Sequence, residues 1–283
     1  MASESKKTKE FSDLSTVEEI REYLETKGPG HTFFFQYTTL NALRGMLKSR
    51  KLYLARMDKL NDALECRSAE ERKKRVYIAS FSFGIAESMA MWSMYGAPYQ
   101  QGARLTIPKR AITGTLKDFA KHPVLYSTET GNEIPFGGSA TLKMMDVVYA
   151  HSGSLEHRRE KLLRKQGNLV SDAKDDPVLA FCMKNEIWLA ENETRMILEL
   201  EEKLPDNIEK VAIDFGHAVD NLEITGSPCL SLAELKQELK NFGKEKIRES
   251  VAYNQVYFNG CKSCGRKTPF CRENKKETQD QCR

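Results

Sequence analysis

Apolar residues along the chain follow strand-like and helix-like spacing in turn. Residues 31–37 (HTFFFQY) are aromatic and β-prone, and residues 38–48 repeat apolar side chains at helical spacing, which predicts a strand that leads into a helix. The same reading predicts strands at 51–55, 76–83, 102–108, 143–149, 193–199, 208–215 and 252–258. It predicts further helices at 15–27, 69–75, 87–95, 154–166 and 232–242, with loops in the rest of 109–177. These elements predict a mixed α/β chain with one large core.

The composition fits a folded core with a strongly solvated surface. Hydrophobic residues make up 40% of the chain and charged residues 30%, and the net charge of +4 argues against a histone-like nucleic-acid binder. No stretch approaches the ~18 to 20 consecutive apolar residues of a membrane span, and the N-terminus lacks the pattern of a signal peptide. We therefore expect a cytoplasmic protein that has no membrane partner. Seven cysteines, an odd number, fit reduced thiols better than a disulfide framework.

Several common signatures of active sites are absent from the sequence. It has no Gly-x-Gly-x-x-Gly after a strand, no Walker loop, no Gly-x-Ser-x-Gly elbow and no His-Glu-x-x-His helix. The five histidines are far apart in sequence, so neither a histidine-rich metal site nor a Cys/His nucleophile pair is indicated. Chemistry that depends on these motifs is therefore not expected.

Three blocks of aromatic, hydroxyl and carboxylate residues remain as candidates for a site. They are Gln36-Tyr37-Thr38 followed by Asn61-Asp62-x-x-Glu65, then Ser80-Phe81-Ser82 followed by Met91-Trp92-x-x-Tyr95 and Gly102, and last Trp188-x-x-Glu191-x-Glu193-x-Arg195. Composition alone would place most of these residues in the strands and turns of a core, with Trp92 in a buried aromatic cluster. For Glu191 and Glu193, the alternative to a site is a pair of exposed carboxylates on an edge strand, one of them paired with Arg195.

The order and spacing of these blocks resemble the family described as domain of unknown function 2971, over roughly residues 33–258. The shared pattern is aromatic-Tyr-Thr, Asn-Asp then Glu, Ser-Phe-Ser, Trp-x-x-Tyr before a glycine, and Glu-x-Glu-x-Arg. By fold-level analogy the family looks like the ADP-ribosyltransferase superfamily of the histidine-tyrosine-glutamate kind, in which a split mixed β-sheet with flanking helices grips NAD. The resemblance therefore implies an α+β fold of this kind, with NAD as a substrate.

The resemblance also implies roles for individual residues. Glu193 would be the catalytic carboxylate that stabilises the oxocarbenium-like cation formed when the nicotinamide glycosidic bond breaks. Glu191, expected on the same strand face, would activate the acceptor. The residues implied to hold NAD are Gln36, Tyr37, Thr38, Ser80, Ser82 and Tyr95, with Tyr95 stacking on nicotinamide.

Two of these assignments have alternatives. Ser80 and Ser82 point to one face of the same strand and could bond either a ribose or the backbone. The superfamily often has histidine where this chain has Gln36. Glutamine can hydrogen-bond a ribose hydroxyl, but it lacks the ring and cannot become charged.

A second constellation lies at the C-terminus, outside the resemblance. Cys261-x-x-Cys264 has the spacing of a zinc knuckle, and Cys271 and Cys282 could complete a tetrahedral site, although the gaps of six and ten residues match no zinc motif. The alternatives are a structural zinc and a flexible reduced tail. The expected organisation is a polar N-terminal extension with a helix (1–30), an ADP-ribosyltransferase-like domain (31–258) and a basic Cys-rich tail (259–283).

The resemblance implies an NAD-dependent ADP-ribosyltransferase-like protein that modifies a protein or nucleic-acid acceptor, as a toxin or anti-phage defence effector would. A close variant is an NAD glycohydrolase, in which water replaces the acceptor. A different class is a non-catalytic module that binds RNA or DNA, with a zinc-stabilised basic tail. Convergence of the candidate side chains around a carboxylate would favour the enzyme.

Overall fold

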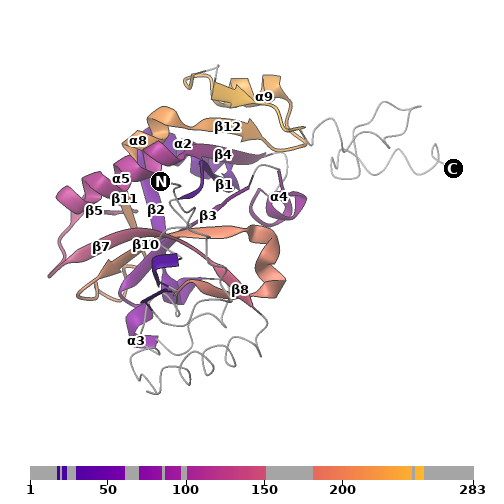
Figure 1. The fold of residues 1–283 in the computed structure, drawn as a ribbon. Coiled ribbons are helices and arrows are strands. Elements are labelled where there is room, and N and C mark those ends of the chain that lie inside the picture. Colours follow the sequence, from indigo (N-terminus) through magenta and orange to yellow (C-terminus); the bar gives the residue numbers. More distant parts are fainter. Residues whose placement is uncertain are drawn as a thin grey trace, which may run out of the picture. The chain divides into compact units, whose positions relative to one another are not determined.

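The chain is a mixed α/β protein with a large mixed β-sheet and helices (Figure 1). This computed structural model describes residues 18–19, 21–23, 30–60, 70–84, 87–96, 101–150, 181–243 and 246–251. The expected mixed sheet with helices is therefore confirmed, while the ADP-ribosyltransferase-like layout stays a prediction. Contacts divide the chain into two compact units. The first unit comprises Met1–His31, Tyr53–Ser80 and Leu125–Val211, and the second comprises Thr32–Leu52, Phe81–Val124 and Ala212–Arg283.

Neighbouring strands of the second unit run antiparallel to each other, except for one parallel pair at the edge of the sheet. Its strands are β1 (Phe33–Thr39), β4 (Gly102–Pro108), β12 (Glu223–Gly226) and β13 (Ile247–Arg248), in the order β13–β12–β4–β1. The end of β3 (Val76–Ser82) adds Ser82 opposite Phe35 of β1, and β4 places Arg104 opposite Tyr37. Because alternate residues of a strand share a face, these four side chains lie on one face of the sheet.

The described residues of the second unit form five helices, and side chains cap some of their N-termini. They are α2 (Leu40–Ser49), α4 (Met89–Tyr95), α5 (Lys109–Lys121), α8 (Gly216–Asn221) and α9 (Leu232–Glu238). Thr39 ends β1 and caps α2 by accepting from Ala42 N, while Ser231 and Glu234 form a capping box at α9. Helices α5 and α8 lie side by side (Figure 1). Among the described residues, no helix has the length and apolar character that crossing a membrane requires.

An aromatic cluster fills one part of the second unit. Phe35 and Tyr37 of β1 pack with Met91 and Trp92 of α4, and Trp92 is fully buried. The rings of Tyr37 and Trp92 meet edge to face, with their centroids 4.9 Å apart. The expectation that Trp92 belongs to a buried aromatic cluster is therefore confirmed.

The first unit is organised around β10 (Glu193–Leu200), which has a strand on each side. It pairs with β3 and, antiparallel, with β7 (Ala140–Asp146), in a register that runs from Thr194 opposite Asp146 to Leu200 opposite Ala140. The other strands that lie wholly or partly in this unit are β2 (Lys51–Arg56), β5 (Leu125–Ser127), β6 (Glu133–Ile134), β8 (Val148–Ala150), β9 (Met183–Asn185) and β11 (Lys210–Asp214). Its short helices are α3 (Glu70–Lys73) and the 3-10 helices η2 (Met57–Lys59) and η6 (Glu186–Glu191).

Most predicted elements of the described part are present, but several observed elements, among them α5, α8 and β12, were not predicted. The strands predicted at 76–83, 102–108 and 193–199 correspond to β3, β4 and β10 within a residue or two. Helix α5 falls in a stretch that was predicted to be loop, and it contains Thr113, Gly114 and Thr115, which are weak helix formers. Its buried face, which includes Ala111, Ile112 and Phe119, stabilises it instead. The predicted helix at 154–166 and strand at 252–258 lie outside the described residues.

Substituting two glycines should have opposite effects on stability. An alanine methyl at Gly102 would lie 2.5 Å from the Gly96 carbonyl oxygen, whereas at Gly45, inside α2, it would meet no heavy atom within 4 Å beyond the neighbouring backbone of its own helix. We expect Gly102→Ala to lower the free energy of unfolding by about 1–3 kcal/mol. Gly45→Ala should raise it by about 0.5–1 kcal/mol, because alanine loses less conformational entropy in a helix. Urea unfolding of both variants tests the pair, and a stable Gly102→Ala protein would contradict the packing of β4.

Candidate functional site

The carboxylate of Glu193, the first residue of β10, accepts hydrogen bonds from three side chains. Its Oε1 accepts from Ser80 Oγ at 2.5 Å and from Arg195 Nε at 2.7 Å. Its Oε2 accepts from Arg195 Nη2 at 3.0 Å and from Lys184 Nζ at 3.1 Å. Ser80 and Glu193 belong to different predicted blocks, 113 residues apart, and β3 and β10 bring them into contact.

A second carboxylate completes the group. Lys184 Nζ donates to Glu191 Oε2 at 2.6 Å as well as to Glu193, and the Trp188 ring lies 4.8 Å from the same ammonium. We call Lys184, Glu191, Glu193 and Arg195 the buried ion quartet, since each of the four residues is at most 5% exposed. Its two cations and two anions balance, as buried charges require.

Asn192 explains how the two carboxylates reach one lysine. Glu191 ends the 3-10 helix η6, and Asn192 then adopts a left-handed conformation with φ of 42° before β10 begins. Asparagine tolerates this conformation better than most residues do. The expectation that Glu191 and Glu193 lie on the same strand face is therefore wrong, because Glu191 is not in the strand. The two meet at Lys184 because the chain turns between them.

Backbone and tyrosine contacts hold the quartet in place. Arg195 Nη1 donates to the Phe181 carbonyl at 2.7 Å, and the Tyr149 hydroxyl accepts from Glu193 N at 2.7 Å. Tyr149 of β8 also lies opposite Lys184 of β9 in a parallel pair. Lys184 and Tyr149 belong to none of the sequence blocks, so they are the residues of this site that sequence reasoning missed.

The quartet keeps Glu193 ionised. Burial alone would raise the pKa of its carboxyl group, but Arg195, Lys184 and Ser80 outweigh that effect and lower the pKa from 4.5 to about 2. Burial also raises the pKa of the Tyr149 hydroxyl, so this group stays protonated. A permanent carboxylate suits electrostatic stabilisation of a cation, whereas a general acid would need a proton to give.

Ser80 and the Glu193 carboxylate that it contacts differ in their exposure to solvent. Ser80 is the exposed residue of β3, whereas Glu193 is 3% exposed. The alternative of exposed carboxylates on an edge strand is therefore wrong, because both glutamates are buried and β10 has a neighbour on each side. The pairing with Arg195 that accompanied this alternative is present. A ligand at this surface would touch the Ser80 hydroxyl, which could accept a hydrogen bond while it donates to Glu193.

The remaining candidate residues belong to the second unit, and strand alternation divides them. Tyr37 and Ser82 share the face that carries Phe35, whereas Gln36 and Thr38 point to the opposite face. The Tyr37 hydroxyl accepts from Ser88 N at 2.9 Å, and burial raises its pKa. Tyr95 packs against the aromatic cluster and is only partly buried. Roles of these residues in holding NAD stay predictions.

Arg104 is a buried cation with poor partners. Its side chain lies over the Phe35 ring, 4.0 Å from the centroid, and its Nε has no hydrogen-bond partner among the described residues. The nearby Glu87 carboxylate lies 4.0 Å from Nη1 and already accepts from Trp92 Nε1, Ser250 Oγ and Val251 N. Glu87 is therefore satisfied without Arg104.

Metal ligation finds no support in the described part of the chain. Within it, no cluster of three or more His, Cys, Asp or Glu side chains could hold a metal ion. Cys182 and Cys229 form no disulfide bond in the described part of the chain. The candidate zinc ligands Cys261, Cys264, Cys271 and Cys282 lie outside the described residues, so the zinc hypothesis stays a prediction.

Comparison with known proteins adds no assignment. Neither the family models, nor the curated proteins, nor the solved structures contain a match to this chain. The resemblance to domain of unknown function 2971 therefore stays a hypothesis, and the function has to be argued from the geometry of the site.

Removing the carboxylate at position 193 should change how stability depends on pH. Because the folded-state pKa lies below the unfolded value, the stabilisation by Glu193 is complete above pH ~4.5 and is lost as the pH falls toward 2. Glu193→Gln should therefore be several kcal/mol less stable than wild type at pH 7, and the gap should shrink between pH 4.5 and 3. Urea unfolding at these pH values measures the gap.

A matched control lies on the same strand. Glu199 pairs with Arg72 at a partly exposed position of β10, so Glu199→Gln should cost less than about 1 kcal/mol at pH 7. A gap for Glu193→Gln that does not change with pH would contradict an ionised, buried Glu193.

The two buried arginines should respond differently to removal of their charge. Arg195→Met leaves a buried carboxylate short of its bidentate partner and should cost about 3–5 kcal/mol. Arg104→Met removes a cation that lacks a hydrogen bond at Nε, so the free energy of unfolding should change by less than about 1 kcal/mol or rise. Thermal and urea unfolding of both variants distinguish the cases. Equal losses in the two would show that Arg104 has stabilising partners.

Proposed function

We propose that this chain cleaves NAD as an ADP-ribosyltransferase-like enzyme and passes ADP-ribose to a macromolecular acceptor. The observation that carries the proposal is the contact between Ser80, exposed on β3, and Glu193, buried and ionised at the start of β10. The resemblance in the ordered sequence blocks motivates the choice of NAD. The geometry supports the choice of Glu193 as the carboxylate, because two blocks that are distant in sequence supply the Ser80 hydroxyl and the Glu193 carboxylate that meet.

The reaction divides into bond cleavage and capture. The glycosidic bond between the ribose carbon and the nicotinamide nitrogen breaks, and its electron pair leaves with nicotinamide, which becomes neutral. Positive charge develops on the ribose carbon, where a fixed negative charge nearby lowers the barrier. The acceptor then bonds to that carbon and loses a proton. When water is the acceptor, the same cleavage gives free ADP-ribose, which is the glycohydrolase variant.

Ser80 connects the buried charge to the substrate in this proposal. A ribose hydroxyl that donates to Ser80 Oγ would extend the chain of hydrogen bonds to Glu193 and bring its charge to bear on the ribose. Lys184 and Arg195 keep the carboxylate ionised and fixed, so little reorganisation is needed as the cation forms.

Glu191 takes a different role from the one first expected. It is buried and bonded to Lys184 at 2.6 Å, which suits it to positioning that lysine rather than to activating an acceptor. The acceptor would then lose its proton to another group or to solvent.

Nicotinamide release from NAD by the purified chain, with and without RNA, DNA and cell lysate, tests the proposal. Glu193→Gln should lower release on the order of 10² to 10³-fold. Ser80→Ala should lower it about tenfold or more and should cost about 1–3 kcal/mol of stability, because a hydrogen bond to the buried Glu193 carboxylate is lost while the ion quartet stays intact. Label on the adenosine side of NAD separates the outcomes, since transfer labels a macromolecule and hydrolysis labels only free ADP-ribose.

Glu199→Gln is the matched control, because it removes the same charge from the same strand away from the quartet. It should leave release unchanged. Absence of release by wild type under every condition, or release that Ser80→Ala and folded Glu193→Gln both retain, would refute the proposal.

A further inference from the structure

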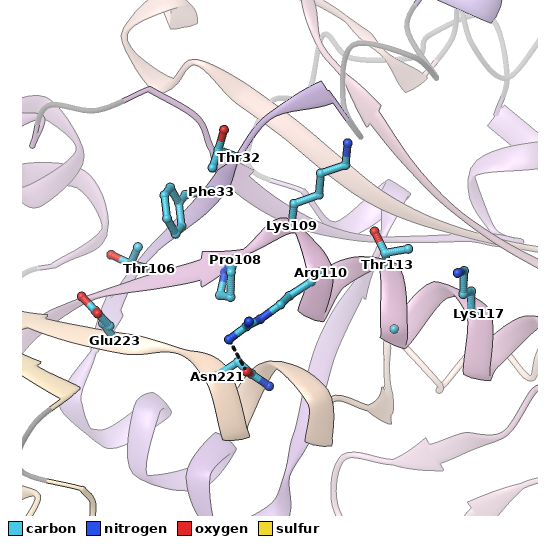
Figure 2. Close-up of a pocket in the computed structure, with 11 residues that line it drawn as sticks. Thr32, Phe33, Thr106, Pro108, Lys109, Arg110, Thr113, Lys117, Asn221 and Glu223 are labelled. Carbon is cyan, nitrogen blue, oxygen red and sulfur yellow. Dashed lines mark hydrogen bonds between the residues drawn. The ribbon is translucent and has the colours of Figure 1, made fainter.

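A pocket of about 1080 Å³ opens in the second unit, on the sheet face where β4 leads into α5 (Figure 2). Phe33, Thr106, Pro108 and Glu223 line its floor from neighbouring strands β1, β4 and β12. The strand registers pair Phe33 with Pro108 and Thr106 with Glu223, so all four project to the same face. None of them belongs to the quartet or contacts Ser80 in any described interaction.

Helix α5 gives the pocket its charge. Lys109, Arg110 and Lys117 line it from about two turns of this helix, and its first turn contains no acidic residue. Neither lysine makes an ion pair or hydrogen bond with another described side chain, and the nearby Asp118 is bonded to His217 at 2.8 Å. Arg110 donates to Asn221 Oδ1 at 3.0 Å, as Figure 2 shows.

Glu223 is the acidic side chain of the lining, and it is partly neutralised. Arg248 Nε lies 3.5 Å from its Oε2, in a pair that is about half exposed. Three cations against this one anion leave the lining with a formal charge of +2. The charge favours an anionic ligand.

The other lining groups indicate what the anion is attached to. The Phe33 ring is 46% exposed and offers a flat apolar surface. Thr32, Thr106 and Thr113 also line the pocket and supply hydroxyl groups. A purely anionic ligand such as free phosphate would leave the ring and most of the volume unused.

We infer that this pocket binds a nucleotide, with its phosphate attracted by the basic lining of Lys109, Arg110 and Lys117 and its base stacked on Phe33. The volume lies just above the roughly 300–1,000 Å³ typical of ligand pockets, so one nucleotide with its sugar fits easily. Ammonium groups recognise phosphate as charged hydrogen-bond donors, and an exposed ring stacks on any base. The ligand is either a free nucleotide or a nucleotide unit of a single strand. This inference does not depend on NAD cleavage at Ser80 and Glu193.

Isothermal titration of the full chain with AMP, adenosine, inorganic phosphate and a pentanucleotide tests the inference. AMP should bind about tenfold tighter than adenosine and than phosphate, because each of these probes lacks one of the recognised groups. The affinity for AMP should fall as salt rises from 50 to 200 mM. A pentanucleotide that binds at least tenfold tighter than AMP would identify a strand as the source, and equal affinities would identify a free nucleotide.

Paired variants separate the pocket from general basicity. Lys109→Gln with Lys117→Gln should weaken AMP binding about tenfold or more. The control Lys121→Gln with Lys240→Gln removes the same charge from exposed lysines, one of them on α5, that do not line the pocket. Phe33→Leu should weaken AMP binding about tenfold and leave phosphate binding unchanged.

Three results would overturn the inference. They are no binding of AMP or pentanucleotide, equal weakening by the pocket and control variants, and phosphate binding as tight as AMP binding. Nicotinamide release should be the same in the pocket variants as in wild type. Loss of nucleotide binding is thereby distinguishable from failure of the proposed NAD chemistry.

Discussion

The first unit depends on the pairing of four charges that cannot be buried separately. Removing an ion from water costs several kcal/mol, so Lys184 and Arg195 are tolerated only because Glu191 and Glu193 lie within hydrogen-bonding distance. This constraint ties β9, η6 and β10 together, since each contributes at least one member. It also fixes the carboxylate that Ser80 touches. The geometry of the candidate site is therefore a consequence of the requirement for charge neutrality.

Sequence patterns predicted the parts of this arrangement that depend on local spacing. The apolar runs of β3 and β10 were recognisable, and the resemblance selected Ser80 and Glu193 before their contact was known. Lys184 could not be found in this way, because its position depends on how η6 and Asn192 turn the chain back. Because of the same turn, Glu191 lies outside β10 and does not share a strand face with Glu193. Helix α5 was missed because its packing, rather than its helix propensity, stabilises it.

In the second unit, adjacent residues of one sequence block have different environments. The block Gln36-Tyr37-Thr38 suggested one ligand-binding group, yet the alternation of β1 sends Tyr37 to the aromatic cluster and its two neighbours to the opposite face. The Tyr37 hydroxyl satisfies Ser88 N, which leads into α4. A buried tyrosine with a satisfied hydroxyl stabilises packing whether or not it also meets a ligand. Whether such a residue serves packing or ligand binding depends on its burial, which the spacing of residues in the sequence does not predict.

The same charged residue types serve different ends in the two units. The ion quartet is neutral as a whole, so at a distance it neither attracts nor repels the anionic pyrophosphate of NAD. At short range the two signs of charge are not equivalent, because Ser80 bonds directly to the Glu193 carboxylate. Charge developing beside Ser80 would therefore be stabilised in the transition state without tight binding of the ground state. Lys109 and Lys117, which have no acidic partner among the described residues, suit the opposite task of attracting an anion before any contact forms.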